Sequence, residues 1–161
     1  MALFNMAQLM EELSPGQRLL GIDPGSRTIG LALSDVMRMV ASPCGVVKRG
    51  KLSVVADEIQ KIISREDVGG MVVGLPLSLD GSFGPAAQAA RDWALALSER
   101  LGIRAAVWDE RFSSSVVNRL LVGEADLSRK RRQEVVDKLA AAYMLQGVLD
   151  HHALRIAPEQ E

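Results

Sequence analysis

The sequence predicts an α/β protein in which a mixed β-sheet is flanked by helices. Two short apolar runs, residues 18–23 and 28–35, are separated by a Pro-Gly turn, which favours a β-hairpin. After them, segments with helical and strand periodicity alternate along the chain, as is typical of helices packed on the faces of a sheet. The 161 residues are enough for one domain with a substantial core.

The middle of the chain is expected to contribute two strands and one helix. Residues 44–48 form a predicted strand, and residues 52–65 repeat apolar side chains at helical spacing. The expected apolar face of that helix consists of Val55, Ile59, Ile62 and Ile63. The run MVVGLP, residues 71–76, is β-branched, apolar and closed by a proline, which indicates a buried strand.

The second half is predicted to add helices and one more strand. A helix at about residues 85–100 begins at Pro85, whose missing N–H costs nothing in a first turn. Residues 103–108 are expected to form a strand, followed by helices at 113–122 and at about 130–150. The expected apolar stripe of the helix at 85–100 consists of Ala89, Ala90, Trp93, Ala94 and Leu97.

We expect an N-terminal extension over residues 1–17, one domain over 18–150 and a C-terminal tail over 151–161. Apolar residues of the extension recur at helical spacing, and Ser14-Pro15-Gly16 ends the pattern. This pattern predicts a short amphipathic helix or a frayed segment. A signal peptide is not expected, because a basic beginning is missing and Glu11-Glu12 occupy the place of a cleavage site.

Composition narrows the class of protein. The net charge is −1, and Cys44 is the single cysteine, which excludes an internal disulfide and a multi-cysteine zinc site. Apolar stretches stay well short of the roughly 20 residues that a membrane-spanning helix needs. The sequence therefore predicts a cytoplasmic protein with no membrane partner.

Three acidic residues stand at informative places. Asp23 ends the first strand, Glu110 follows the strand at 103–108, and Asp137 lies in the last helix. Sites in open α/β sheets gather near strand ends, so Asp23 and Glu110 lie where a site is expected if their strands are neighbours.

Asp137 falls within the small apolar face of its helix. At about 100° per residue, Ala140, Ala141, Met144 and Val148 lie within roughly 60° of it. The two alanines would let the helix approach the sheet closely and bring Asp137 toward the strand ends. A carboxylate there is costly to keep charged, so an arginine, a lysine or a metal is expected to neutralise it.

Each acid also has a purely structural interpretation. Asp23 could form a turn with Pro24-Gly25, Glu110 could belong to a solvated loop, and Asp137 could pair with Lys138 or a distant arginine. Three carboxylates brought together, however, repel one another unless cations neutralise them. An all-oxygen cluster suits Mg²⁺ or Mn²⁺, and two such ions could activate a water and stabilise the leaving oxygen in phosphodiester hydrolysis.

A basic run, Arg129-Lys130-Arg131-Arg132, begins the last helix, with Ser128 as its expected N-cap. Cations are unfavourable in a first helical turn, because the helix dipole is positive there. We interpret the run as a binding site for the phosphate backbone of a nucleic acid. The alternative is a solvated face paired with acids such as Glu124 and Asp126.

The chain resembles the YqgF-type family over about residues 18–150. The motifs that carry the resemblance are GIDPGSRTIGLALSD, VVGLPLSLDGS, WDERFSS and VVDKLAAAYMLQ, in the order and spacing of the family. Members are described as Holliday junction resolvases or as nucleases that process the 5′ end of pre-16S ribosomal RNA. The resemblance implies an RNase H-like fold, with a five-stranded mixed sheet flanked by helices, and an acidic site for Mg²⁺ or Mn²⁺.

The resemblance also implies roles for individual residues. Asp23, Glu110 and Asp137 match the three acids of the family, and these acids are expected to act as catalytic residues and metal ligands. Residues resembling the family's contacts to nucleic acid are Arg111, Arg129, Lys130, Arg131 and Arg132. In the turn after Asp23, Gly25 leaves room for a phosphate, and Ser26 and Arg27 are expected to contact it. The family often has Gly-Thr-Lys/Arg after the first acid, whereas Gly25-Ser26-Arg27 stands here and keeps a hydroxyl and a cation.

These observations predict a metal-dependent endonuclease whose partner is nucleic acid, with the 5′ end of pre-16S rRNA as first choice of substrate. A Holliday junction is the alternative, but it demands paired active sites, and a monomer or weak homodimer is expected. Another class, a non-catalytic nucleic-acid-binding regulator, would account for the basic run alone. A nucleotide-hydrolysing protein of the actin-like type would need two domains, and 161 residues are too few.

Overall fold

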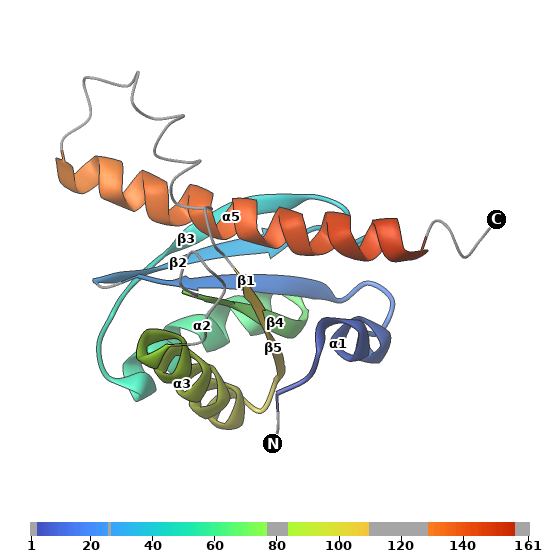
Figure 1. The fold of residues 1–161 in the computed structure, drawn as a ribbon, viewed down its shortest axis with the longest axis horizontal. Coiled ribbons are helices and arrows are strands. Elements are labelled where there is room, and N and C mark those ends of the chain that lie inside the picture. Colours follow the sequence, from blue (N-terminus) through green and yellow to red (C-terminus); the bar gives the residue numbers. More distant parts are fainter. Residues whose placement is uncertain (1–2, 26, 77–83, 110–128, 157–161) are drawn as a thin grey trace.

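The computed structural model describes residues 3–25, 27–76, 84–109 and 129–156, and in the last helix the side chains of residues 136 and 138–152. Its centre is a twisted five-stranded sheet with the strand order β3-β2-β1-β4-β5. One long helix, α5, crosses one face of this sheet, while α2 and α3 cover the other (Figure 1). The predicted α/β architecture is therefore confirmed.

The sheet is mixed, as expected. An antiparallel meander, β1 (Arg18–Pro24), β2 (Thr28–Ser34) and β3 (Ala41–Lys48), forms one half. The strands β4 (Val68–Leu75) and β5 (Arg104–Asp109) add to the other side of β1, and both run parallel to it. The Pro-Gly turn makes the predicted hairpin, and β1 becomes the central strand.

The helices agree with the predicted order. They are α1 (Met6–Glu12), α2 (Leu52–Glu66), α3 (Pro85–Leu101) and α5 (Arg129–Ile156). The C-cap residues Asp67 of α2 and Gly102 of α3 both adopt the left-handed conformation, and Gly102 adopts it without a steric penalty. The expected helix at 113–122 lies outside the described residues. Within the described residues, none of the helices has the length and apolar character needed to cross a membrane.

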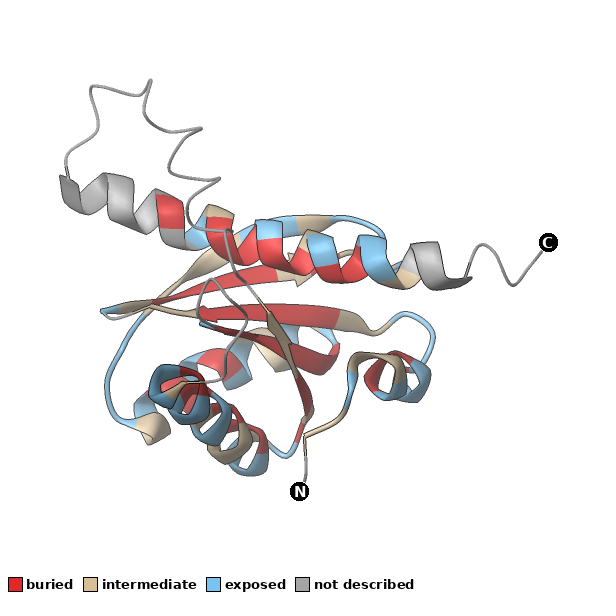
Figure 2. Cartoon of the chain, viewed as in Figure 1, coloured by how far each residue is buried: buried red, intermediate tan, exposed pale blue. Residues whose placement is uncertain are grey.

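Alternation along β1 divides its side chains between the two helical layers. Leu20 and Ile22 belong to the core beneath α2 and α3, whereas Leu19 belongs to the core beneath α5. Successive strand residues point to opposite faces, so Asp23 shares the α5 face with Leu19 and Gly21. Both faces of β1 are buried, as Figure 2 shows.

The apolar stripe predicted for α3 is confirmed at the buried residues Ala90, Ala94 and Leu97, and it is wrong at Ala89. Ala89, expected in the apolar stripe, is exposed, and Trp93 is only partly buried. The buried residues of α3 are Ala87, Ala90, Ala94, Leu97 and Ser98. Alanine is frequent on several sides of this helix, so the sequence pattern fixes its rotation poorly, and packing against the sheet decides it.

The N-terminal segment forms a helix, one of the two alternatives predicted for it. Asn5 caps α1 through a reciprocal pair of hydrogen bonds with Gln8. Leu9 is fully buried in the core beneath α5. The backbone N–H of Phe4 donates to the carbonyl oxygen of Ala105 at 2.8 Å, which adds a short parallel bridge at the edge of β5. This segment therefore completes the core.

Candidate active site

Asp23 is a buried acid at the carboxyl end of the central strand. It is 9% exposed and pairs with Gly30 of β2. Asp23 ends the buried part of β1, because Pro24, which follows, is half-buried and leads into the turn. Residues that only form a turn usually lie at the surface, whereas Asp23 is buried at the end of its strand.

The carboxyl ends of three parallel strands meet at this edge of the sheet. Ile22 pairs with Val73, and the last pair between β4 and β5 joins Leu75 to Asp109. Neighbouring strands lie about 4.8 Å apart, so β1 and β5 are separated by about 10 Å. The strands that carry the first two predicted acids are therefore on the same edge. Glu110 itself follows Asp109 in the sequence and lies outside the described residues.

Helix α5 lies very close to β1. A Cβ atom placed on Gly21 would lie 3.0 Å from the Cβ of Leu145 and 3.5 Å from the carbonyl oxygen of Ala141. Glycine at this position thus permits the close approach, and a Cβ there would require Leu145 to move by a few tenths of an ångström.

The hydrogen bond of Gln146 shows the direction of α5 across the sheet. The side-chain oxygen of Gln146 accepts from the N–H of Ala41 at 2.8 Å, and Ala41 pairs with Ser34 at the amino end of β1. Helix α5 therefore runs from the carboxyl end of β1 toward its amino end, and Figure 1 shows its start at the same end as the β1–β2 turn.

The backbone positions of Asp23 and Asp137 follow from this arrangement. Asp137 precedes Ala141 by four residues, or about 6 Å along the helix. Asp23 follows Gly21 by two residues, or about 6.6 Å along the strand, toward the same end. The helix position of Asp137 is therefore one turn from the contact with Gly21, on the side of Asp23. Its side chain lies outside the described residues.

The buried face of α5 is the one predicted around Asp137. Ala140, Ala141, Met144 and Val148 are all buried, whereas Lys138 is exposed. Val136, the residue before Asp137, is also buried. The predicted apolar face is confirmed for the described side chains.

Trp108, near the end of β5, contacts helix α5. Its ring meets the ring of His151 edge-on, with 5.4 Å between the centroids. Trp108 also packs against the core beneath α5. The last helix therefore contacts both strands that carry or precede the predicted acids, β1 through Gly21 and β5 through Trp108.

The turn after Asp23 is held by backbone and side-chain hydrogen bonds. The N–H of Gly25 donates to the carbonyl oxygen of Thr28 at 2.9 Å, and Arg27 is exposed. The guanidinium of Arg49 donates to the carbonyl oxygen of Gly25 at 2.6 Å. The predicted contacts Ser26 and Arg111 lie outside the described residues.

Arg49 is a residue that the sequence analysis missed. Besides its side-chain bond to Gly25, its backbone N–H donates to the carbonyl oxygen of Arg27 at 3.0 Å. The signal that could have found it is the stretch KRGK, residues 48–51, which places three cations directly between a strand and a helix.

The predicted metal ligands are all carboxylates, the donor type that Mg²⁺ and Mn²⁺ prefer. Asp23 is the one predicted ligand whose side chain is described, and the described residues contain no group of three or more His, Cys, Asp or Glu that could hold a metal. A buried carboxylate is a suitable ligand for hard divalent cations. The basic run Arg129–Arg132 begins α5, but its side chains lie outside the described residues.

A family model and several relatives match nearly the whole chain, and their names describe nucleases or resolvases. The family model described as "RuvX: Holliday junction resolvase" matches residues 17–151. A protein of Gluconacetobacter diazotrophicus named "Putative pre-16S rRNA nuclease" is 67% identical over 150 residues, which cover 93% of this chain and 97% of the relative. A protein of the same name from Gluconobacter oxydans is 64% identical over 150 residues, covering 93% and 94% of the two chains.

A solved structure of a resolvase has a similar fold. The Fowlpox virus resolvase, solved in complex with its substrate Holliday junction DNA, matches with a TM-score of 0.50 and 7% sequence identity. The match covers 84% of this chain and 99% of that chain.

Proposed function

This chain belongs to the RuvX family, has an RNase H-like fold and is a hydrolase of phosphodiester bonds, and we propose that it processes the 5′ end of pre-16S rRNA. The observation that carries the proposal is the buried Asp23 at the carboxyl end of β1, beneath a helix that approaches the strand closely. Relatives that match more than nine-tenths of the chain bear the name of a nuclease with that substrate.

We propose Asp23, Glu110 and Asp137 as the catalytic acids. The set is supported by the burial of Asp23, by the parallel strands β1, β4 and β5 that end at one edge, and by the close contact between α5 and Gly21. The buried apolar face of α5 around the position of Asp137 also supports it.

These acids would hold Mg²⁺ or Mn²⁺, whose preferred ligands are carboxylate oxygens. Divalent cations held there would supply an activated water and neutralise charge at the scissile phosphate. The chain's own residues bind and orient the substrate: Gly25 leaves room for a phosphate to approach, and Ser26 and Arg27 supply a hydroxyl and a cation beside it. Arg111 and the run Arg129–Arg132 are proposed to hold the nucleic-acid backbone.

The alternative substrate is a Holliday junction, which the description of the family model favours. Cleavage of a four-way junction requires two active sites in one assembly, whereas processing of an RNA end requires one. We propose a monomer or weak homodimer, which fits the RNA substrate better. Maturation of ribosomal RNA in bacteria takes place in the cytoplasm, where we also place the protein.

The test compares cleavage of two substrates, an RNA and a DNA junction, by the wild type and by variants of two aspartates. The purified chain is incubated with a pre-16S 5′-leader RNA and with a four-way DNA junction, with Mn²⁺ or with EDTA. We expect cleavage of the RNA with Mn²⁺, and a decrease of more than about 100-fold in Asp23→Asn, since loss of even an outer-shell partner of a metal costs roughly 10- to 100-fold. Asp35→Asn is the matched control, because Asp35 follows β2 at the opposite end of the sheet.

The outcomes separate the alternatives. Cleavage of the junction but not the RNA would replace the proposed substrate with the second one. Binding of either nucleic acid that persists in EDTA, with no cleavage under any condition, would favour a non-catalytic regulator. Full activity of Asp23→Asn would exclude the proposed site.

A further inference from the structure

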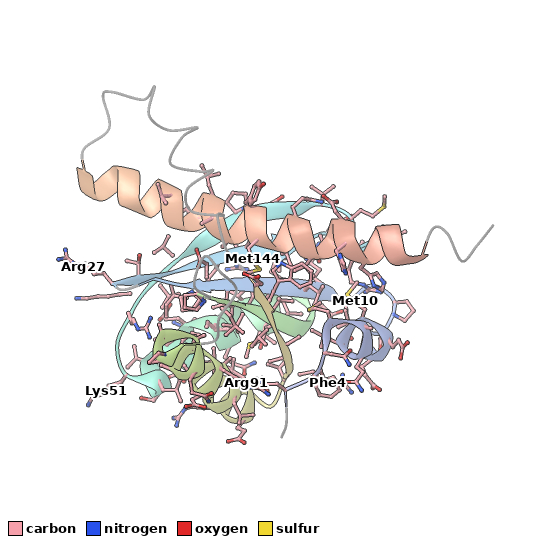
Figure 3. The ribbon with its side chains drawn as sticks, viewed as in Figure 1. Phe4, Met10, Arg27, Lys51, Arg91 and Met144 are labelled. Atoms are coloured by element: carbon pink, nitrogen blue, oxygen red, sulfur yellow. The ribbon has the colours of Figure 1, made fainter. Side chains whose placement is uncertain are left out.

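A corner of the molecule near Asp23 carries four exposed cations. Arg27 lies in the β1–β2 turn, Lys48 ends β3, and Arg49 and Lys51 lie in the connection to α2. We refer to Arg27, Lys48, Arg49 and Lys51 as the basic corner. Figure 3 shows Arg27 and Lys51 at the same end of the molecule, where α5 begins.

Backbone contacts bring these residues together. Lys48 pairs with Thr28, and the N–H of Arg49 donates to the carbonyl oxygen of Arg27 at 3.0 Å. The guanidinium of Arg49 reaches Gly25, which follows Asp23 by only two residues. Two residues of extended chain span about 7 Å, so the basic corner adjoins the proposed catalytic acid.

Within the part of the chain that the structure describes, no ion pair neutralises the cations of the basic corner. The sequence contains no aspartate or glutamate between Asp35 and Asp57. Among the described residues, the ion pairs involve Arg18, Lys61, Arg65 and Arg104, and none of the four cations of the basic corner. Helix α2 begins beside Lys51 without an acid in its first turn, so its positive end adds to the local potential.

Arg49 is held in place for contact with an anion. Its guanidinium lies 5.8 Å from the centroid of the Trp93 ring, within cation–π range, and donates one hydrogen bond to Gly25. The planar guanidinium has five N–H donors in a fixed geometry that matches phosphate oxygens. A restrained arginine of this kind loses little freedom when a phosphate binds.

We propose that the basic corner is a second nucleic-acid-binding surface, which holds the sugar–phosphate backbone of the substrate beside Asp23. The proposal rests on the nuclease function proposed above and extends it to Lys48, Arg49 and Lys51. The run Arg129–Arg132 begins the helix that covers one face of the sheet, whereas Arg49 contacts α3 on the other face. The substrate would therefore cross the carboxyl edge of the sheet, between two basic surfaces.

The test measures how strongly binding depends on salt. Fluorescence anisotropy gives the Kd of a labelled pre-16S 5′-leader RNA at several KCl concentrations, in EDTA so that cleavage does not interfere. Each phosphate contact with a single strand contributes about 0.7 to the slope of log K against log salt. We therefore expect Lys48→Gln/Lys51→Gln to bind more weakly and to reduce the slope by about 1.4.

The matched control is Lys61→Gln/Arg100→Gln. It removes the same charge from exposed positions, near the ends of α2 and α3 that precede the amino ends of β4 and β5. This variant is expected to keep the wild-type slope, and thermal unfolding of both double variants verifies that they are folded.

Failure of this inference can be distinguished from failure of the proposed function. Suppose that Lys48→Gln/Lys51→Gln keeps the wild-type slope while the wild type cleaves the RNA and Asp23→Asn does not. The proposed role of the basic corner in binding is then overturned, and the nuclease function stands. If the slope falls as expected but the wild type cleaves nothing with Mn²⁺, the binding surface is supported and the proposed function is overturned.

Discussion

Gly21 lies directly beneath Leu145, and this contact sets the distance between the central strand and the last helix. A Cβ atom on Gly21 would lie 3.0 Å from the Cβ and 3.3 Å from the Cδ2 of Leu145. The backbone of α5 is in van der Waals contact, because the carbonyl oxygen of Ala141 would lie 3.5 Å from the same Cβ. A larger residue would require Leu145 to move, and the Cβ of Leu145 is fixed to the helix backbone, so the expected response is a small shift of α5.

Gly21→Ala is therefore expected to destabilise the fold by about 1–3 kcal/mol, as overpacking of a core does. Because α5 carries Asp137, the same change is expected to lower the cleavage rate of the folded protein. Urea unfolding and single-turnover cleavage measure the two effects. Gly45→Ala in β3 is the control, because a Cβ there meets no atom within 4 Å. Equal effects of the two substitutions would show that the spacing of α5 and β1 is unimportant.

Arg49→Lys tests whether the contact with Gly25 positions the turn beside Asp23. Lysine keeps the charge but lacks the planar guanidinium, so it cannot hold both Gly25 and the face of Trp93 in the same way. We expect kcat to fall several-fold while the salt dependence of RNA binding stays at the wild-type slope. Arg49→Gln should reduce both. A wild-type kcat for Arg49→Lys would mean that the positive charge alone matters.

Asp35, at the opposite end of the sheet, is expected to make the free energy of unfolding depend on pH. The N–H groups of Val40 and Met39 donate to its carboxylate, and these hydrogen bonds lower the pKa of Asp35 below its ordinary value of 3.8. A group with a lowered folded-state pKa stabilises the protein above its unfolded-state pKa, and that contribution is lost as the pH falls through the folded-state pKa.

The comparison of wild type with Asp35→Asn isolates this contribution. The difference in their free energies of unfolding should be constant at neutral pH and should shrink as the pH falls below 3.8. Thermal or urea unfolding between pH 7 and pH 3 measures it. A difference that stays the same down to pH 3 would contradict the assignment of these hydrogen bonds to the ionised carboxylate.

Leu9→Ala tests the contribution of the N-terminal helix to the core. Leu9 is fully buried, and its Cδ1 lies 2.8 Å from the place of a Cβ on Gly70 of β4. Loss of a buried leucine costs about 2–5 kcal/mol, which lowers the Tm of a domain of this size by at least about 4 °C. Glu11→Ala, on the exposed side of α1, is the control. An unchanged Tm for Leu9→Ala would indicate that α1 folds independently of the sheet.

Local patterns predicted most of the fold. The Pro-Gly turn between two apolar runs indicated the hairpin of β1 and β2, and the helical wheel around Asp137 identified the buried face of α5. Both features depend on residues close in sequence, where periodicity and turn chemistry are informative. Burial of Ala140, Ala141, Met144 and Val148 confirms the apolar face that the helical wheel predicted.

Features that depend on distant residues were not predictable in the same way. The docking of Leu9 onto Gly70 joins segments sixty residues apart, and nothing in the first residues indicates the partner. The rotation of α3 was misjudged at Ala89 because alanines supply little contrast between faces. Arg49 was missed because a cation in a loop normally indicates a solvated surface, and only the structure shows its bond to Gly25.

The central claim is that Asp23, Glu110 and Asp137 hold divalent cations at the carboxyl edge of the sheet. A crystal structure of the protein soaked in Mn²⁺, with the ion located by its anomalous scattering, tests this claim most directly. We predict a carboxylate oxygen from each of the three residues at about 2.0–2.6 Å from Mn²⁺, the range for hard cations. Mn²⁺ bound elsewhere, or an ion at Asp23 that Glu110 and Asp137 do not contact, would contradict the proposed site.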